Sequence, residues 1–293
     1  SRVGESWDLS GMPGSESVVA EGPWTGSTLP ELIGRFGAEL LGKANYARFG
    51  QEFPLLVKFI DAREDLSIQV HPDDELARKR HGKSGKCEMW YVLEAEPGAS
   101  LLTGFSRPIA PAEYERRVAD NTLTDVLNRQ AIASGDVFYL PAGRVHSIGK
   151  GSFIVEIQQS SDITYRIYDF DRRDAAGNSR ELHTELAREA IDFESSENSR
   201  ITYAPENNQE VRLVTTPYFT TSLYTLTART RCDWSATDSF VAIVLLQGSG
   251  SLTDNEGNRI DVRQGETWLL PASTQWTEIT PHTAPLRLLT SRI

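Results

Sequence analysis

The sequence contains the segment Gly135-Asp136-Val137-Phe138-Tyr139-Leu140-Pro141-Ala142, and it contains a second version, Gly265-Glu266-Thr267-Trp268-Leu269-Leu270-Pro271-Ala272, without a gap in the alignment. In both copies the glycine permits a turn into a strand, and the proline ends the strand because it cannot donate a ladder hydrogen bond. The residue five positions after the proline is His146 in the first copy and Trp276 in the second. We expect this residue to point into a barrel, so only the first copy keeps a possible ligand there.

Short β-type segments, bounded by Gly, Pro, Asn and Asp, make up most of the remaining sequence, as is typical of sandwiches and barrels. The expected strands cover residues 55–60, 66–71, 88–93, 136–140, 153–158, 220–226, 240–246 and 266–270. The repeated G-D/E-x-x-x-L-P-A pattern also resembles the second half-motif of the cupins, which are small jelly-roll (double-stranded β-helix) domains. The sequence therefore predicts a mainly β protein with two tandem cupin domains.

Helical patterns are few. Thr28 is a suitable N-cap for a helix that continues to about Leu41, and further apolar helical spacings occur at 110–129 and 185–191. A polar stretch, 195–209, suggests the domain boundary. We expect a catalytic metal-binding domain at 1–200, with a small helical insertion at about 110–130. Residues 201–293 are expected to form a degenerate cupin domain without a metal site.

The composition restricts the possible partners and locations. The formal net charge of the 293 residues is -11, and no stripe of Lys and Arg with interleaved aromatics occurs, which disfavours nucleic-acid binding. No apolar run is long enough to span a bilayer, and residues 1–10 do not resemble a signal peptide. The two cysteines, Cys87 and Cys232, do not suggest a disulfide framework. We expect a cytoplasmic protein with no membrane or nucleic-acid partner.

The segment Ser67-Ile68-Gln69-Val70-His71 alternates polar and apolar residues. The strand period of two places Ser67, Gln69 and His71 on one face, and the apolar residues can pack against a second layer on the other face. Three polar side chains on a half-buried strand need partners, since burying them unsatisfied is costly. A metal ion that binds His71 and Gln69 would meet this need.

Two further residues complete a possible metal site. Glu88 lies in an apolar strand, where a carboxylate is costly unless it is paired or coordinated, and His146 occupies the inward position after Pro141. Taken singly, His71 could be a hydrogen-bonded core histidine and Glu88 a salt-bridge partner. Together the nitrogen and oxygen donors favour a catalytic divalent metal, zinc or alternatively iron, manganese or cobalt. His81, His183 and His282 show no such grouping, and His81 is expected to be solvated.

Longer motifs resemble type I mannose-6-phosphate isomerases (phosphomannose isomerases), especially the shorter bacterial form. They are S-I-Q-V-H-P-D-D (67–74), G-K-C-E-M-W-Y (85–91), L-P-A-G-R-V-H-S-I (140–148), E-I-Q-Q-S-S-D-I-T-Y-R-I-Y-D-F-D-R (156–172) and R-E-L-H (180–183). The resemblance implies metal ligation by Gln69, His71, Glu88 and His146. It also implies an active-site arginine at Arg166 and a substrate lysine at Lys86, with Ser67 near the phosphate and an acid at Asp162.

The resemblance further implies a zinc-dependent aldose–ketose isomerase, with one zinc ion per chain, that interconverts mannose 6-phosphate and fructose 6-phosphate through a cis-enediol. Asp162, Lys86 and a metal-bound water are the alternatives for the base. The remaining functional alternatives are another metal-dependent cupin enzyme and a non-catalytic sugar-binding cupin. A monomer or a homodimer fits the sequence. The family pattern has a leading segment with a first strand that this sequence lacks, so either the chain is trimmed or its numbering begins late.

Overall fold

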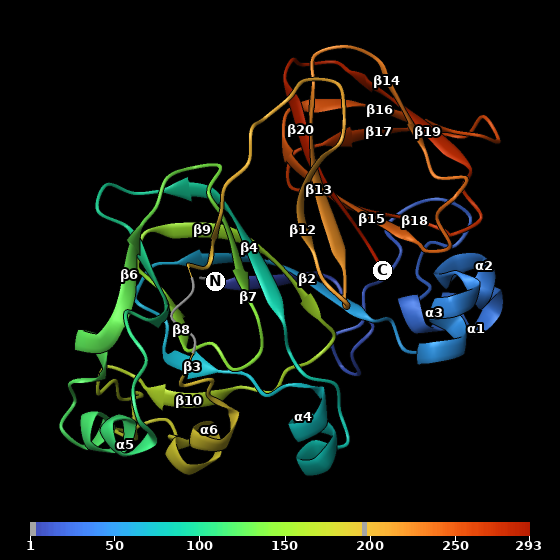
Figure 1. Cartoon of the computed structure of the whole chain (residues 1–293). Helices are drawn as coiled ribbons and strands as arrows, with labels where there is room; N and C mark the ends of the chain where they lie inside the picture. Colours follow the sequence, from blue (N-terminus) through green and yellow to red (C-terminus); the bar gives the residue numbers. More distant parts are fainter. Residues whose placement is uncertain (1–3, 195–197) are drawn as a thin grey trace. The chain divides into compact units, whose positions relative to one another are not determined.

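The computed structural model describes residues 4–194 and 198–293 (Figure 1). The chain divides into two compact units, the first with Ser1–Ser6 and Val57–Ile201, the second with Trp7–Leu56 and Thr202–Ile293. The division at Ile201 lies beside the boundary expected at residue 200. In contrast, residues 7–56, expected in the first domain, group with the second unit. Residues 195–197 of the polar boundary stretch lie outside the described residues.

The first unit is built on antiparallel sheets. One sheet has the order β1-β2-β9-β4-β7-β11, with bounds Glu5–Leu9, Leu55–Ala62, Ser152–Gln159, Glu88–Ala95, Val137–Leu140 and Arg200–Ile201. The other has the order β10-β3-β8-β5-β6, with bounds Tyr165–Tyr168, Ile68–Val70, His146–Ile148, Ser100–Phe105 and Leu127–Ala131. Apolar side chains of both sheets pack together, among them Ile60, Trp90, Leu101, Phe138 and Ile148. The fold is mainly β, as predicted, and the facing sheets are those of a cupin barrel.

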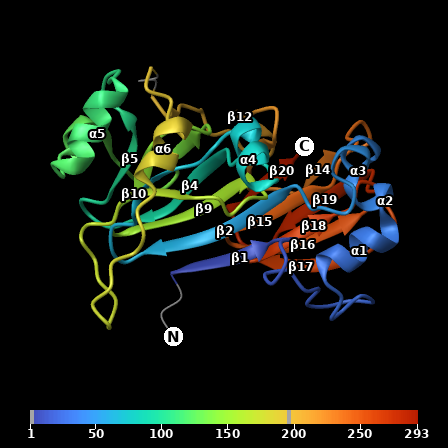
Figure 2. The ribbon, with the colours of Figure 1, turned by 90° about the horizontal axis from the view of Figure 1, so that it is seen from below.

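Helices α4 (Asp74–His81), α5 (Pro111–Ala119) and α6 (Thr184–Ala190) lie on the outer side of the sheet that contains β3 and β10 (Figures 1 and 2). Ile68 and Val70 of β3 pack in one cluster with apolar side chains of all three helices. The expected alternation in β3 is therefore confirmed, because the residue between them, Gln69, must face the opposite way.

The interval 110–129, predicted to be helical, is only partly so. α5 ends at Ala119, Asn121 adopts a positive φ of 56°, and a short 3-10 helix, η1 (Leu123–Val126), follows. The last residues belong to β6, which pairs with β5. The helical prediction for this part was wrong, because an apolar pair three or four residues apart is also compatible with a tight turn that leads into a strand. After Pro72, the chain forms α4, with Asp73 as its N-cap.

The second unit has the same kind of facing sheets. One sheet has the order β12-β13-β20-β15-β18, with bounds Val211–Thr215, Thr220–Leu226, Leu286–Arg292, Val241–Gln247 and Thr267–Leu270. The other has the order β14-β19-β16-β17, with bounds Thr230–Asp233, Trp276–Pro281, Ser249–Asp254 and Arg259–Arg263. The sequence repeat is structurally equivalent, since β7 and β18 each follow a glycine with positive φ, 91° at Gly135 and 86° at Gly265.

The helices of the second unit come from the segment between β1 and β2. They are α1 (Leu29–Phe36), α2 (Ala38–Leu41) and α3 (Lys43–Phe49), separated by Gly37 and Gly42. Thr28 caps α1 in a capping box with Glu31, as expected from the sequence. Within the described residues, no helix is long and apolar enough to cross a membrane.

Candidate metal centre

A row of inward-facing side chains crosses the sheet that contains β10, β3, β8 and β5. Gln69 of β3 lies opposite Arg166 of β10 on one side and opposite His146 of β8 on the other. His146 lies in turn opposite Thr103 of β5. Directly paired residues of an antiparallel ladder point to the same face, and Gln69 faces away from the helices. All four side chains therefore face the barrel interior.

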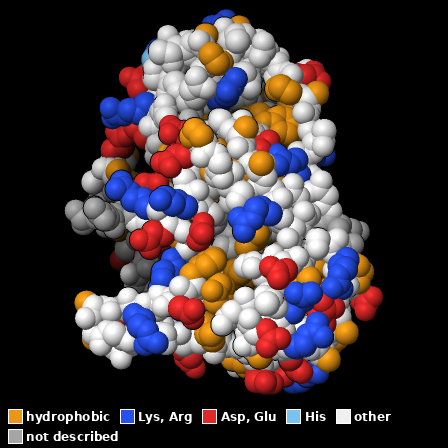
Figure 3. All heavy atoms as spheres, turned by 90° about the vertical axis from the view of Figure 1, so that its left-hand side faces the viewer, with side chains coloured by type: hydrophobic (Ala, Val, Ile, Leu, Met, Phe, Trp, Pro, Cys, Tyr) orange, Lys and Arg blue, Asp and Glu red, His pale blue; other side chains and the backbone are white. Residues whose placement is uncertain are grey.

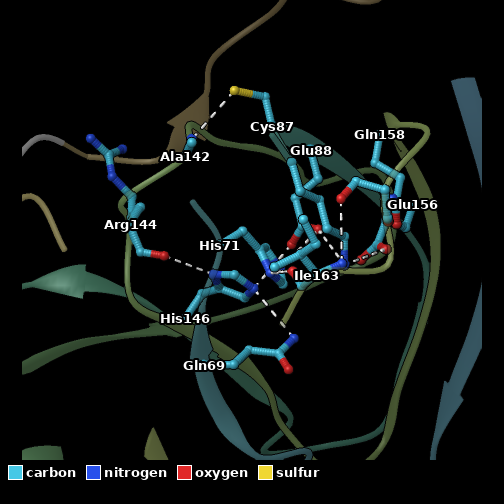
Figure 4. Close-up of polar contacts among 12 residues, drawn as sticks. Gln69, His71, Cys87, Glu88, Ala142, Arg144, His146, Glu156, Gln158 and Ile163 are labelled. Atoms are coloured by element: carbon cyan, nitrogen blue, oxygen red, sulfur yellow. Dashed lines mark hydrogen bonds and ion pairs between the residues drawn. The ribbon is translucent and has the colours of Figure 1, made fainter. Parts of the chain in front are cut away.

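Glu88 approaches the same point from the opposite sheet, at the start of β4. Its Oε1 lies 3.1 Å from His146 Nε2, and its Oε2 lies 3.5 Å from His71 Nε2. The ligand atoms of these residues lie within 4.8 Å of one another, and all three side chains are buried. Figure 4 shows them converging, with the carboxamide of Gln69 beside His146. The structure thus brings together the His/Glu/His set that the sequence predicted.

Main-chain carbonyl groups orient both imidazole rings. His71 Nδ1 lies 2.9 Å from Ile163 O, and His146 Nδ1 lies 2.8 Å from Arg144 O. Because a carbonyl only accepts, each Nδ1 carries a proton, and in the neutral form of each ring the lone pair of Nε2 points into the site. A histidine that ligates a metal typically has this outer partner.

The charges of the site are fixed by burial and by close neighbours. Burial lowers the pKa of His71 to about 3, and nearby Lys86 adds to the effect. Burial alone would raise the pKa of Glu88, but Lys86, His146 and His71 outweigh it and hold the pKa of this carboxyl well below its usual range. Neutral imidazoles and an ionised carboxylate are the forms that bind a divalent cation.

Polar atoms that meet at this point make no hydrogen bond within the described residues, although the Lys86 ammonium group lies 3.5 Å from Glu88 Oε2. His71 Nε2 and both carboxylate oxygens of Glu88 are buried, and they have no hydrogen-bond partner among the described residues. Leaving such atoms unsatisfied is costly, whereas a cation bound between them would satisfy all of them. The donors are nitrogen and oxygen without thiolate, which suits zinc and other divalent first-row metals. The residues present therefore fit a metal.

Gln69 lies at the edge of this group. Its Nε2 is 3.5 Å from His146 Nε2 and its side chain is only partly buried. Rotation of the carboxamide by 180° about its last bond would bring the oxygen to the same place, and an amide oxygen is an acceptable fourth ligand. The position is as the alternation in residues 67–71 predicted.

A buried charged cluster adjoins Glu88. Lys86 Nζ lies 3.5 Å from Glu88 Oε2 and 4.0 Å from Glu156 Oε1. Lys58 Nζ lies 3.7 Å from Glu156 Oε1, and Trp90 Nε1 donates to Glu156 Oε2 at 3.0 Å. Burial would lower the pKa of Lys86, but the carboxylates of Glu88 and Glu156 outweigh it and raise this pKa. Burial raises the pKa of Glu156, and Glu88 adds to the rise.

Sequence reasoning missed Lys58 and Glu156. Both lie within strands that are otherwise mostly apolar, β2 and β9, and both are buried. The argument that singled out Glu88, the cost of an ionisable group in an apolar strand, applies equally to them. That signal was present in the sequence.

The remaining predicted residues lie at different depths. Ser67 is buried immediately before β3. Arg166 is half-buried; its Nη1 donates to Glu181 O at 3.0 Å, and its Nε is buried with no hydrogen-bond partner among the described residues. Asp162 lies on a loop with its side chain 44% exposed, and its carboxylate binds Lys83 Nζ at 2.9 Å. Asp162 is thus engaged at the surface by a lysine that the sequence had not singled out.

The corresponding positions of the second unit carry no comparable set. Trp276 pairs with Asp233 in the way that His146 pairs with Gln69, and Val241 pairs with Leu270 in the way that Glu88 pairs with Leu140. Arg231 stacks on the Trp276 ring, 3.9 Å from its centroid. Across residues 4–194 and 198–293, His71, Glu88 and His146 form the one group of three possible ligands.

Comparison with known proteins shows the family to which this chain belongs. Residues 1–103 match the family model described as phosphomannose isomerase type I, catalytic domain. A mannose-6-phosphate isomerase of Streptococcus mutans is 35% identical over 270 residues, which are 92% of this chain and 83% of that protein. The probable mannose-6-phosphate isomerase GmuF of Bacillus subtilis is 34% identical over 274 residues, 92% of this chain and 84% of that protein.

Solved structures agree with these relatives. The crystal structure of the mannose 6-phosphate isomerase from Bacillus subtilis matches 99% of this chain and 90% of that chain, with a TM-score of 0.87 and 31% sequence identity. A putative mannosephosphate isomerase from Archaeoglobus fulgidus, 20% identical with a TM-score of 0.77, shares the fold over 98% of this chain and 87% of that chain. On this evidence, the chain belongs to the type I mannose-6-phosphate isomerase family.

Proposed function

We propose that this protein interconverts mannose 6-phosphate and fructose 6-phosphate, with one zinc ion held by His71, Glu88 and His146 and with Gln69 as fourth ligand. The observation that carries the proposal is the convergence of buried, unsatisfied ligand atoms, His71 Nε2 and the Glu88 oxygens, in a chain of this family. The first unit would then be the catalytic one. The second unit, which has Trp276 and Val241 at the corresponding positions, would be structural.

The proposed reaction transfers a proton between C1 and C2 of the sugar through a cis-enediol. It requires a group that accepts the proton from carbon and a positive environment for the oxygen that becomes negative. A bound divalent cation supplies part of that environment as a Lewis acid.

Lys86 is proposed as a cation that stabilises the developing negative charge and donates a proton to a substrate oxygen. Its raised pKa keeps the ammonium group charged, so the acid role suits it better than the base role. Glu156 lies 4.0 Å from it, and the raised pKa of this carboxyl allows it to hold a proton closer to neutral pH. Asp162 is a weaker candidate for the base, since Lys83 binds its carboxylate.

Arg166 is proposed to bind the phosphate or the enediolate oxygens. It lies beside Gln69 in the inward-facing row, and its buried Nε has no protein acceptor among the described residues. A guanidinium group presents several donors in a plane and is suited to a phosphate or a carboxylate-like dianion. Ser67, buried beside β3, would contribute a hydroxyl group near the phosphate. Asp162 would contribute a carboxylate to the substrate site from the loop before β10.

Mixed charge on the surface is compatible with a small substrate. On the face shown in Figure 3, Lys and Arg side chains alternate with Asp and Glu side chains instead of forming a stripe of one sign. A sugar phosphate needs only the local cations described above, so we propose no nucleic-acid partner. A cytoplasmic location and a monomeric or homodimeric state remain our expectations.

The test of the proposed function is a coupled assay in which the purified protein converts mannose 6-phosphate to fructose 6-phosphate. Unphosphorylated mannose and glucose 6-phosphate serve as comparison substrates. We expect turnover of mannose 6-phosphate in both directions and at least a hundredfold preference over unphosphorylated mannose, because the phosphate provides much of the binding energy. Absence of turnover in a metal-loaded, folded sample would refute the proposal.

A further inference from the structure

The backbone of Arg166 is bound on its outer side by a single residue. β10 is an edge strand, paired on one side with β3. On the other side, Arg166 N donates to His183 Nδ1 at 3.0 Å, and His183 N donates to Arg166 O at 2.7 Å. His183 therefore supplies the acceptor and the donor that a neighbouring strand would otherwise supply.

These bonds matter because the ladder alone holds Arg166 weakly. Since both main-chain groups of Arg166 point toward His183, Arg166 and Gln69 form a non-hydrogen-bonded pair of the antiparallel ladder. The register also shifts between Arg166 and Tyr168. Such a shift disrupts the ladder locally, so the contacts on the other side of β10 contribute more to the position of Arg166.

The segment that carries His183 also binds the guanidinium group. Arg166 Nη1 donates to the main-chain oxygen of Glu181 at 3.0 Å. The start of this segment is anchored by Arg180, whose Nε and Nη2 bind the two carboxylate oxygens of Asp169 at 2.8 and 2.5 Å. The Asp169 side chain is only 7% exposed, so this bidentate pair is a stable anchor.

His183 itself is held in a defined position. Its main-chain oxygen accepts from Ala187 N at 2.8 Å as α6 begins, so the backbone is fixed by the helix. Since Nδ1 accepts the Arg166 N–H, the ring proton is on Nε2, which lies 3.8 Å from the exposed Glu181 carboxylate. The centroid of the His183 ring also lies 6.3 Å from the centroid of the Tyr165 ring.

We infer that His183 is a positioning residue for the isomerase reaction. Without contacting the substrate, it fixes the main chain of Arg166 and thereby aims the guanidinium group into the barrel beside Gln69. This inference rests on the proposed function, in which Arg166 binds the substrate. A displacement of about 1 Å in a positioned charged group can lower turnover a hundredfold, so an effect through the backbone is sufficient.

The test compares variants at position 183 in the metal-loaded full chain. His183→Ala should lower kcat/KM about tenfold, with unchanged metal content and thermal midpoint. His183→Asn should restore most of the loss, because asparagine Oδ1 and histidine Nδ1 are both bonded to Cγ and can accept the same hydrogen bond. His183→Gln, whose amide is one carbon further out, should restore less. The matched control is His81→Ala, because His81 also binds β10, through Tyr165 OH at 2.7 Å, but not Arg166.

A double-mutant cycle with Arg166→Ala separates positioning from general stabilisation. If His183 acts through Arg166, adding His183→Ala to Arg166→Ala should cause no further loss of kcat/KM. Additive losses, or equal activity of the Asn and Gln variants, would overturn the inference. If His183→Ala does not fold, the comparison of Asn with Gln still decides. An inactive wild type would instead refute the proposed function, so the two failures are distinguishable.

Discussion

Arg166 lies directly opposite Gln69, on neighbouring strands of the same sheet, and both side chains face the barrel interior. This pairing places a guanidinium group next to the proposed metal ligands although the two residues are almost a hundred positions apart in the sequence. A sugar phosphate bound by Arg166 would therefore lie close to the His/Glu/His group. The relationship depends on strand register, which a slip of one residue would destroy.

Glu88→Gln is predicted to abolish tight metal binding. Glu88 contributes the negative charge of the proposed ligand set and faces both His71 and His146. Metal analysis after dialysis should give about one metal ion per wild-type chain and nearly none for the variant. Glu94→Gln is the matched control, since Glu94 belongs to the same strand but is exposed, and it should keep the metal. Full metal content in Glu88→Gln would contradict the assignment.

Arg166→Ala is predicted to lower turnover by at least a hundredfold while leaving the metal in place. The guanidinium group belongs to the inward-facing row but lies on β10, beyond Gln69. Loss of a cation that stabilises developing negative charge typically costs about 3 kcal/mol of transition-state stabilisation. Arg129→Ala, on the outer strand β6, is the control. Steady-state kinetics together with metal analysis measure both effects. Wild-type turnover in Arg166→Ala would exclude a role of Arg166 in binding the substrate.

The metal-free protein is predicted to lose stability as the pH falls below 6.5. Burial lowers the pKa of His71 to about 3, so the unfolded chain binds this proton at a higher pH than the folded chain does. The contribution of neutral His71 to the free energy of unfolding is therefore complete above pH 6.5. It falls by about 1.4 kcal/mol per pH unit as the pH decreases toward 3. Denaturant unfolding at pH 7 and pH 5 in the presence of chelator measures it. In His71→Asn the free energy of unfolding should depend less steeply on pH, by the contribution of one proton. If the slope is the same as in the wild type, His71 is not a buried neutral histidine.

Gly42→Ala is predicted to destabilise the second unit by at least about 2 kcal/mol, through backbone strain and a clash. Gly42 has a φ of 94°, and a Cβ there would lie 2.2 Å from the main-chain oxygen of Asp238. The same Asp238 caps α3 through the N–H groups of Lys43 and Ala44. Gly50→Ala is the control, since it has a positive φ but open space around it. Thermal unfolding should show a clearly larger loss for Gly42→Ala than for Gly50→Ala.

Much of the first barrel could be predicted from local sequence signals. The alternation of polar and apolar residues around Gln69 predicted which face of the sheet its side chain lies on. The sequence repeat predicted the positions of β7 and β18, and the spacing from Pro141 predicted the inward position of His146. These features depend on two-residue periodicity and on turn chemistry, which act over a few residues. The prediction of Glu88 used the cost of a buried charge, a general argument that needs no knowledge of the neighbours.

Other features depend on contacts between distant segments and could not be predicted in this way. His183 appeared isolated in the sequence because its partner, the backbone of Arg166, is brought to it only by the segment that returns from β10. The grouping of residues 7–56 with the second unit also depends on distant contacts, among them Ala272 N bonded to Leu40 O. The strand β6 was missed because its pairing with β5, not its own pattern, determines it.

Metal removal and restoration test whether isomerase activity depends on a metal ion bound by the His/Glu/His group. The purified protein is stripped with a chelator, assayed with mannose 6-phosphate, and assayed again after addition of one equivalent of zinc. We expect about one metal ion per chain before stripping, loss of nearly all isomerase activity after it, and recovery on addition of zinc. Undiminished turnover in protein shown to be metal-free would contradict this dependence.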